Sequence, residues 1–509
     1  MDSDGFPRSG PDRPVRDSAD KTRYRIGYGW LGAVVALYLL AFLVYAETWA
    51  FAWDESYHLL AAQLIGRGKR PYIDFCFPQT LVNVYWNAAW MRLLGDSWRV
   101  PHAFAALFTL GAVALTARYV FLRFPAPDWR AAAALTAALL TGLNAEVFGY
   151  APLAQAYGIC LFALLAAFQC AVLAVDRSGP LRAAEAGFLA GMAAASSLLT
   201  AAAAPVLLVW LLFYNRAGSR WTKFSAFCAA AAMPFAPMIW LAWQGPRQAW
   251  FNVIQYHASF RTLYWPHTTR HDLEVLTSWI DSGQALLIGL LAVSGLAYVA
   301  RRSPWPAAIK AEFYLCAWLA AALSAEVATA HPTFSQYFLL AVPFLAILAA
   351  AGLYATVSGG FAAHAFKPSR PLWAVLPVAL LMVLGLAKSF YDDRDATDWS
   401  VYERLARKID EITPRNAVLF ADEPIYFLTR RAPPPGLELA YTHKIDLGPA
   451  ENALLHIVPA AELQRQLQAG LFATAYTCVD ADIQSYHLAS LYRQRLEMEG
   501  CSIFWDLKK

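Results

Sequence analysis

Charged residues are scarce in this sequence. Asp, Glu, Lys and Arg make up 15% of its 509 residues, whereas 58% of the residues are hydrophobic. A soluble globular protein carries about a quarter charged residues. The composition therefore excludes an ordinary soluble protein. It predicts a mainly α-helical, polytopic membrane protein with some soluble mass.

Motifs of several enzyme classes are also missing. The sequence has no Ser-His-Asp signature, no HExxH motif and no Cys/His spacing typical of a zinc site. Its polar C-terminal part has no GxGxxG fingerprint and no P-loop. Serine-hydrolase and zinc chemistry are therefore disfavoured, and no cofactor or metal site is predicted. Whether a divalent metal takes part stays open.

A convincing cleavable signal is absent as well. Residues 1–27 form a polar tail rich in Pro and Arg, and the apolar run at 31–46 lacks a small-residue cleavage site. We therefore expect a cytoplasmic tail followed by a retained signal anchor.

Eleven apolar runs are predicted to cross the membrane as helices. Lys and Arg are enriched in the N-terminal tail and in every second connection, as they are in cytoplasmic loops. The same pattern divides residues 183–214 into two spans, because one long span would place the basic residues at 216–223 outside. It predicts a cytoplasmic N-terminus and an extracytoplasmic C-terminus. The spans lie near residues 28–46, 99–122, 131–149, 154–175, 183–199, 201–214, 223–243, 284–300, 311–328, 337–356 and 372–390, and the basic connections lie at 123–130, 177–182, 216–223, 301–310 and 367–370.

Two outward loops are long, at about 47–98 and 244–283. The first contains apolar residues at helical spacing in 54–67 and a Trp- and Tyr-rich run at 82–94. Both runs predict amphipathic helices that lie in the membrane interface. The second loop carries three histidines, two arginines and four aromatic residues within 255–271, more than a plain linker needs.

From residue 391 the composition becomes that of a soluble domain. Strands and helices alternate there, which predicts a small α/β domain over 391–509. Cys478 and Cys501 could pair if this part faces an oxidising space, but the sequence leaves their pairing open. The expected helices lie at 399–411, 460–469 and 483–497, the strands at 417–420, 472–479 and 502–505, and a Pro-rich turn at 432–436.

An adjacent carboxylate pair, Asp54-Glu55, follows the first span directly. The simplest interpretation is a helix start, with Asp54 as cap and Glu55 at the positive end of the helix dipole. Polar groups at a membrane boundary also mark functional sites. The predicted topology places Glu146, Glu326 and His331 at the same outer level, near basic residues of both long loops. These groups together suit a site that handles a phosphate leaving group and a hydroxyl nucleophile.

This arrangement resembles the GT-C glycosyltransferases, specifically the polyprenyl-phosphate-sugar-dependent branch that includes protein O-mannosyltransferases and lipid A aminoarabinose transferases. The resemblance covers residues 28–390. It rests on the Asp54-Glu55 pair, the interfacial helices, the turn at 66–72, Glu146 at the end of the third span and the His-Pro…Tyr-Phe…Pro stretch at 331–343. It implies a GT-C membrane fold with about eleven spans, in the inner membrane of a bacterium. The tail at 391–509 looks like the α/β tails of bacterial members.

The resemblance also implies roles for individual residues. Asp54 is expected to be the general base that deprotonates the acceptor hydroxyl, with Glu55 and Glu146 as supporting acidic residues. A basic residue normally binds the donor phosphate. In the aminoarabinose branch a Lys-Pro-Pro element follows the turn, and here Phe-Pro-Gln-Thr stands at 77–80. The missing lysine leaves Lys69, Arg70, Arg261 and Arg270 as candidates for the phosphate, with Tyr72, His257, His331 and Tyr337 as further substrate-binding candidates.

The preferred hypothesis is an enzyme that moves a sugar from a polyprenyl-phosphate carrier to a hydroxyl acceptor on the outer side of the membrane. The acceptor could be a lipid, a glycan or a protein. A transporter or flippase is the alternative from another class, and Glu185 in the fifth span is the residue that favours it. An inactive scaffold with the same fold is a third possibility.

Overall fold

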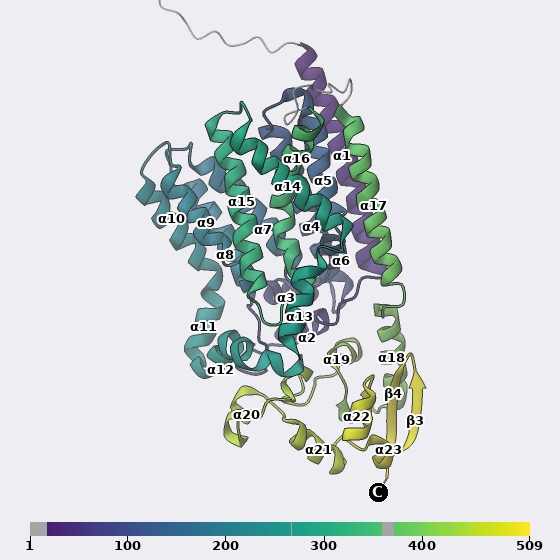
Figure 1. The fold of residues 1–509 in the computed structure, drawn as a ribbon. Helices are drawn as coiled ribbons and strands as arrows, with labels where there is room; N and C mark the ends of the chain where they lie inside the picture. The colour runs from purple at the N-terminus through teal and green to yellow at the C-terminus, as the bar shows by residue number, and fades with distance from the viewer. Residues whose placement is uncertain (1–17, 266, 359–370, 509) are drawn as a thin grey trace, which may run out of the picture.

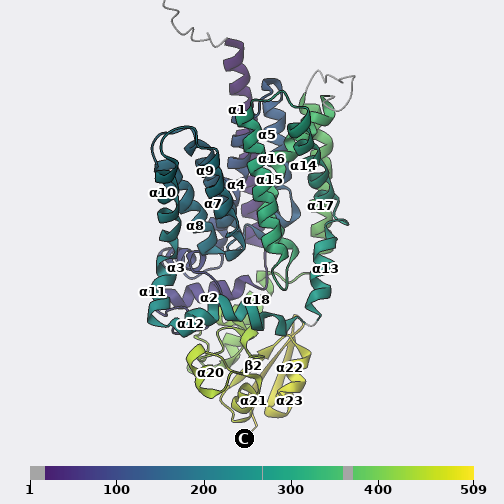
Figure 2. The ribbon, with the colours of Figure 1, turned by 60° about the vertical axis from the view of Figure 1, so that its left-hand side comes forward.

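The computed structural model describes residues 18–265, 267–358 and 371–508. Long helices run side by side in one bundle, a layer of short helices covers one end of it, and an α/β domain packs on that layer (Figures 1 and 2). The first helix begins at Ser18, inside the predicted polar tail, while residues 1–17 and the basic connection at 367–370 lie outside the described residues.

Eight helices or runs of consecutive helices in the described chain are long and apolar enough to cross a membrane. The bundle is thus the polytopic membrane fold that the sequence predicts. These segments are α1 (Ser18–Thr48), α4 (Arg99–Arg123), α7 (Tyr157–Ala174), α10 (Arg220–Ala232) continued by η3 (Met233–Phe235) and α11 (Ala236–Gln244), α14 (Gly283–Arg301), α15 (Ala307–Ala328), η6 (Ser335–Ala341) with α16 (Val342–Val357), and η7 (Pro371–Ala374) with α17 (Val375–Asp392).

Shorter helices occupy the other three predicted spans. Because they fall short of the length of a single crossing, the number of eleven spans stays a prediction. The predicted boundary at 390/391 lies inside α17. The shorter helices are η1 (Pro127–Trp129) with α5 (Arg130–Gly142) and α6 (Ala145–Tyr150), then α8 (Leu181–Ser196), and η2 (Leu198–Thr200) with α9 (Ala203–Phe213).

Glycines allow close helix packing in the bundle. Gly295 of α14 and Gly352 of α16 lie so near the facing backbone that a Cβ atom at either position would overlap a carbonyl oxygen of the other helix. Gly187 and Gly191, four residues apart on α8, face the backbone of α10 in the same way. Small residues at such spacing are a common means of helix association inside membranes, where apolar side chains gain nothing by leaving lipid.

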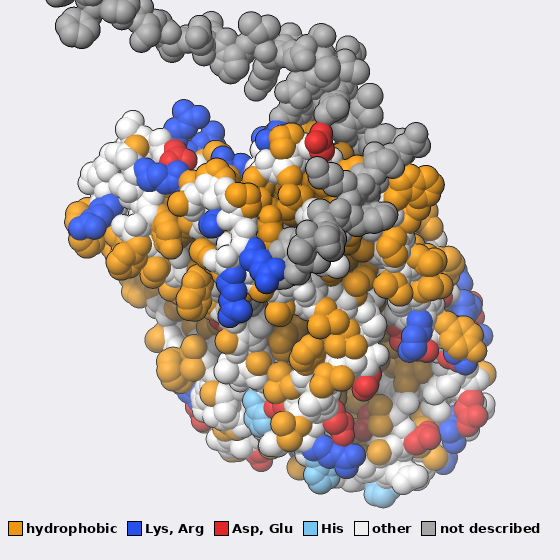
Figure 3. Space-filling view, turned by 45° about the horizontal axis from the view of Figure 1, so that its top comes forward, with side chains coloured by type: hydrophobic (Ala, Val, Ile, Leu, Met, Phe, Trp, Pro, Cys, Tyr) orange, Lys and Arg blue, Asp and Glu red, His pale blue; other side chains and the backbone are white. Residues whose placement is uncertain are grey.

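Basic side chains gather at the end of the bundle opposite the α/β domain. Figure 3 shows several Lys and Arg side chains on this end. Arg123 at the end of α4 holds the buried carboxylate of Glu312 on α15, which also accepts a hydrogen bond from Tyr119 at 2.9 Å.

The layer of short helices contains both amphipathic helices that the sequence predicts, at α2 (Glu55–Gly66) and α3 (Val82–Leu94). Both helices lie at the end of the bundle that faces the α/β domain (Figures 1 and 2). Most side chains of α2 are buried, because α2 packs between α3 and the α/β domain helix α19 (Glu423–Thr429). The second long loop completes the layer with α12 (Pro246–Trp250), the π-helix η4 (Phe251–Phe260), η5 (Arg261–Tyr264) and α13 (Thr268–Ser278).

The C-terminal domain contains one four-stranded sheet of order β1-β2-β4-β3. Strands β1 and β2 are parallel and the remaining pairs are antiparallel. Cys478 and Cys501 form a disulfide beside this sheet. The elements are α18 (Trp399–Ile412), β1 (Leu419–Phe420), α19, η8 (Ala440–Thr442), α20 (Pro449–Leu455), α21 (Ala460–Gln468), β2 (Thr474–Thr477), α22 (Asp480–Ser485), α23 (Leu488–Leu491), β3 (Tyr492–Met498) and β4 (Cys501–Leu507).

The predicted helix at 483–497 is wrong over its second half, which is strand β3. Glu499 and Gly500 both have positive φ, as a tight hairpin between β3 and β4 requires. Pairing with β4, in the register Met498↔Cys501, supplies hydrogen bonds that outweigh the local helix propensity of this segment.

Candidate functional site

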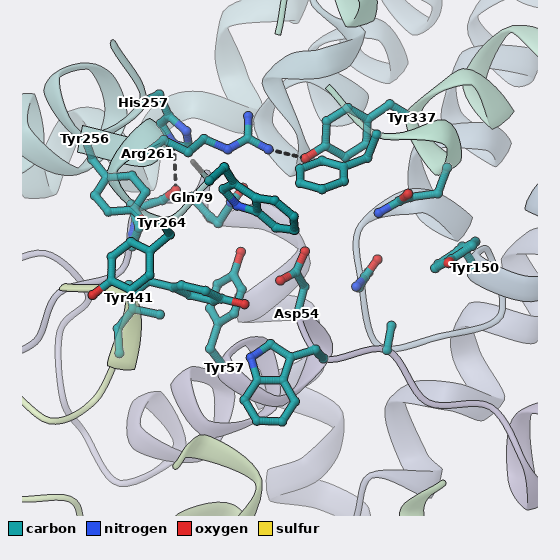
Figure 4. Close-up of a pocket in the computed structure, with 18 of the residues that line it drawn as sticks. Asp54, Tyr57, Gln79, Tyr150, Tyr256, His257, Arg261, Tyr264, Tyr337 and Tyr441 are labelled. Carbon is teal, nitrogen blue, oxygen red and sulfur yellow. Dashed lines mark hydrogen bonds between the residues drawn. The ribbon is translucent and has the colours of Figure 1, made fainter. Parts of the chain in front are cut away.

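A cavity of about 500 Å³ lies where the bundle, the short-helix layer and the C-terminal domain meet (Figure 4). The start of α2, the loops before α3 and α7, the η4–η5 segment, η6 and the domain segment η8 all contribute side chains to it. Its lining residues are Phe51, Ala52, Trp53, Asp54, Tyr57, Pro78, Gln79, Tyr150, Gln155, Tyr256, His257, Arg261, Tyr264, Trp265, Phe334, Gln336, Tyr337, Leu439 and Tyr441.

Asp54 presents its carboxylate to this cavity (Figure 4). It stands at the N-cap position of α2, but its side chain makes no capping hydrogen bond, so the simple cap interpretation is wrong. No hydrogen bond from a described residue reaches the carboxylate. Burial raises its pKa, and the positive charge of Arg261 partly offsets that shift. The group is therefore free to accept a proton.

Glu55 points away from the cavity and is fully buried. Its Oε2 atom lies 2.7 Å from His102 Nε2 on α4, and its Oε1 atom accepts a hydrogen bond from Trp399 Nε1 on α18 at 2.8 Å. The backbone amides of Ala52 and Ala154 donate to it as well, each at 3.2 Å. Every acceptor position of Glu55 is thus used to join segments of the fold, and its expected role as a supporting acidic residue stays a prediction.

Arg261 is the candidate phosphate ligand that the structure places in the cavity. Its guanidinium donates a hydrogen bond to the Tyr337 hydroxyl (Figure 4). It also lies over the rings of Phe334 and Tyr337, at 5.6 and 5.7 Å from their centroids. This stacking holds the guanidinium plane while leaving other N–H groups available for an anion.

The other three basic candidates lie outside the cavity. Lys69 and Arg70 are exposed on the turn after α2, where Arg70 pairs with Asp74 at 2.8 Å. Arg270 on α13 is exposed and pairs with Glu274 at 2.8 Å. None of these three residues lines the cavity that holds Asp54.

A second cavity of about 510 Å³ adjoins the first. The two share Gln79, His257, Arg261 and Tyr337, so Arg261 stands at the junction. The second cavity opens between α8, η4 and the end of α15, and apolar side chains form much of its wall. Its remaining lining residues are Thr80, Ser197, Leu198, Leu199, Val253, Ile254, Ala258, Thr262, Glu326, Thr329, Ala330 and His331.

Two hydrogen bonds hold the backbone strip at 78–79 between the cavities. His257 Nε2 lies 2.7 Å from the Pro78 carbonyl oxygen, which can only accept, so Nε2 carries the proton. Burial and Arg261 lower the pKa of His257 to about 4, which keeps the ring neutral near pH 7. Tyr72, fully buried, donates its hydroxyl proton to the Gln79 carbonyl at 2.5 Å. Tyr72 therefore supports the site from behind and does not line it.

Glu146 lines neither cavity, and His331 lines only the second one. Glu146 on α6 is hydrogen-bonded to Ser335, and its Oε2 atom is buried without a partner among the described residues, outside both linings. His331 lines the second cavity, is half exposed and pairs with Asp272 of α13. Glu326 accepts a hydrogen bond from the Ala202 amide at 2.9 Å.

Several cavity residues were not predicted from the sequence. Tyr57 could have been, because it lies one helical turn after Asp54 on α2. Tyr256 belongs to the aromatic-rich stretch at 255–271 that the sequence already singles out. Tyr150, Gln155 and Tyr441 carry no local signal, since they reach the cavity only through the packing of distant segments. Within the described ranges, no group of three His, Cys, Asp or Glu side chains is placed to hold a metal ion.

Comparisons with known proteins identify the fold. No family model and no curated protein sequence matches the chain. ArnT from Cupriavidus metallidurans, solved bound to undecaprenyl phosphate and in the apo state, is similar in structure, with a TM-score of 0.65 and 15% sequence identity in both cases. Each comparison covers 94% of this chain and 98% of ArnT. The chain therefore has the GT-C membrane fold that the sequence resemblance implies.

Proposed function

We propose that this protein is a membrane glycosyltransferase that moves a sugar from a polyprenyl-phosphate carrier to a hydroxyl acceptor. One observation carries the proposal: a carboxylate free of hydrogen bonds from described residues, Asp54, shares a cavity with a single guanidinium, Arg261. The shared fold supports it, because ArnT was solved with undecaprenyl phosphate.

The proposed step is a displacement at the anomeric carbon of the donor sugar. The acceptor oxygen forms the new bond to that carbon while its proton passes to Asp54. The bond from the anomeric carbon to the phosphate oxygen breaks, and polyprenyl phosphate leaves with the electron pair. A base is needed because a neutral hydroxyl is a weak nucleophile.

Arg261 is the proposed ligand of the donor phosphate. Negative charge on the leaving group grows during the reaction, and a fixed guanidinium stabilises the transition state more than the ground state. Its place at the junction lets the sugar lie in the cavity with Asp54 while the lipid extends along the more apolar second cavity. Tyr337 orients Arg261, and His257 orients the segment at 78–79.

The proposed orientation places both cavities and the C-terminal domain on the extracytoplasmic side. Basic connections favour the opposite end of the bundle as cytoplasmic. The Cys478–Cys501 disulfide supports this orientation, because disulfides persist in oxidising compartments. We further propose residues 391–509 as a domain distinct from the membrane part.

Glu185, the residue that favours a transporter in the sequence, supports that alternative less once its surroundings in the structure are known. Glu185 lies in the first half of α8 and pairs with Arg182 at 2.6 Å, with both side chains partly exposed. It is therefore not a charge buried in the middle of a span, as a transport pathway would require.

Purified protein in nanodiscs, incubated with a panel of undecaprenyl-phosphate sugars and cell-envelope acceptors, tests the proposal. Mass spectrometry should detect undecaprenyl phosphate and a glycosylated product with wild-type protein and neither with Asp54→Asn. A protein that binds no undecaprenyl phosphate and consumes no donor would contradict the proposal and favour an inactive scaffold.

A further inference from the structure

The C-terminal domain forms one wall of the cavity. Leu439 and Tyr441, next to and within η8, both line it, and Tyr441 lies beside Tyr264 (Figure 4). The Tyr441 ring packs edge-on against Tyr264 of η5, with centroids 5.2 Å apart. A domain that only accompanied the membrane part would not need to supply side chains to this cavity.

Hydrogen bonds fix this wall to the membrane part. The Tyr264 hydroxyl donates to the Ala440 carbonyl at 3.0 Å and accepts from the Lys444 amide at 2.9 Å. Behind the wall, the Glu423 carboxylate accepts from the Ala440 amide at 2.7 Å. Tyr264 lies three residues after Arg261, so the segment that carries the guanidinium also holds the domain wall in place.

Charge is sparse on the lining of this cavity. Among its described lining residues, Asp54 and Arg261 are the only two with a formal charge near pH 7, since His257 is neutral. In the proposed function Arg261 binds the donor phosphate. No further cation then remains on the lining for an anionic acceptor, which would meet the negative charge of Asp54 without compensation.

Aromatic rings and amides replace charge on this lining. Ten of its nineteen side chains are aromatic, and three others are glutamines. Gln155 is 7% exposed, and its Oε1 atom has no hydrogen-bond partner among the described residues. A sugar ring matches such a surface, because its C–H face packs on an aromatic face and its hydroxyl edge bonds to amides and phenols. The aromatic residues are Phe51, Trp53, Tyr57, Tyr150, Tyr256, Tyr264, Trp265, Phe334, Tyr337 and Tyr441.

We propose that the cavity end between Asp54 and η8 binds the acceptor, that the acceptor is an uncharged glycan, and that Tyr441 is a specificity-determining residue that contacts it. This inference rests on the proposed function and narrows its acceptor from lipid, glycan or protein to a neutral carbohydrate.

Binding in the absence of donor sugar, with Arg261 occupied by undecaprenyl phosphate, tests the acceptor class. Calorimetry on the full chain in nanodiscs compares neutral gluco- and manno-oligosaccharides, their uronic-acid counterparts and Ser/Thr-containing peptides. Neutral oligosaccharides are expected to bind at least tenfold more tightly than the charged counterparts and the peptides. Preference for a peptide or an anionic glycan, or no binding of any neutral oligosaccharide, would overturn the inference.

Variants of Tyr441 test the wall. Tyr441→Ala should weaken binding of the neutral oligosaccharide at least tenfold, while Tyr441→Phe keeps the ring and should weaken it less. Tyr391→Ala removes an exposed tyrosine outside the cavity and serves as the matched control. Unchanged glycan affinity in Tyr441→Ala would overturn the role of this residue.

Binding of undecaprenyl phosphate, measured on the same samples, separates this inference from the proposed function. If Tyr441→Ala still binds the lipid as tightly as wild type does, the variant is folded. Its loss of glycan binding is then a local effect of the missing ring. If the glycan does not bind while the lipid still binds through Arg261, the inference of a neutral glycan acceptor is overturned and the proposed function is not. Lipid binding and donor consumption that fail while the glycan still binds through Tyr441 would overturn the glycosyltransferase proposal instead.

Discussion

The indole N–H of Trp399 donates a hydrogen bond to the carboxylate of Glu55 across 344 residues of sequence, at 2.8 Å. Trp399 begins the first helix of the C-terminal domain, and Glu55 begins the helix beside Asp54. The domain is therefore joined directly to the short segment that presents Asp54 to the cavity. The two adjacent carboxylates therefore differ in their surroundings. Four protein groups hold the carboxylate of Glu55, whereas that of Asp54 is open to a ligand.

Asp54→Asn should reduce sugar transfer by about 100-fold or more, because an amide cannot accept the acceptor proton. Its melting temperature should match that of wild type, since the Asp54 side chain makes no hydrogen bond within the described part of the chain. Mass spectrometry of donor consumption and a thermal melt of the same sample check both statements. Near wild-type turnover would refute the general-base role.

Glu55→Gln should destabilise the protein by about 3 kcal/mol, because an amide nitrogen would replace one acceptor inside a fully buried network. Trp399→Phe removes a single donor and should cost about 1 kcal/mol. Thermal melts of the two variants in the same detergent give the comparison. If Glu55→Gln melts like wild type, the carboxylate does not hold the domain to α2.

Arg261→Ala should weaken undecaprenyl phosphate binding and lower turnover, whereas Arg261→Lys should retain part of both as a point charge. Lys69→Ala, Arg70→Ala and Arg270→Ala should have little effect, because these side chains lie outside both cavities. Titration of the lipid against each variant checks this. A large loss in any of the three exposed variants, with Arg261→Ala unchanged, would place the phosphate elsewhere.

The pH dependence of transfer should follow Asp54, which must be ionised to act as a base. Burial raises its pKa, so activity should fall with decreasing pH earlier than an ordinary aspartate would require. Arg261 lowers that pKa, and Arg261→Gln should therefore move the acid limb of the turnover profile to higher pH than Arg261→Lys does. Identical acid limbs in the two variants would contradict this electrostatic link.

Single cysteines should report the proposed orientation. Ser490 is exposed on the C-terminal domain. Its variant Ser490→Cys should therefore react with a membrane-impermeant maleimide once the outer side of the membrane is accessible. Ser178→Cys lies exposed in a connection at the opposite end and should react only after the inner membrane is opened. The reverse pattern would invert the topology and the mechanism with it.

Local patterns in the sequence were sufficient for the membrane bundle and for the position of Asp54 directly after the first span. Apolar runs must form helices in lipid, since each backbone group has to be satisfied within the segment. Basic residues recur in alternate connections, which yields a topology without any tertiary information. The C-terminal strands were less predictable, because Tyr492–Met498 is a strand only through its pairing with β4.

Which side chains meet at the cavity was decided by tertiary structure alone. The sequence offered four basic residues on equal terms, and packing of η5 against η6 placed only Arg261 beside Asp54. It offered Asp54 and Glu55 as a pair, and burial against His102 and Trp399 turned one of them into a structural link. It gave no reason to expect Tyr441. Hydropathy and periodicity depend on neighbours in sequence, whereas a binding site depends on contacts between segments hundreds of residues apart, and only the folded chain brings those together.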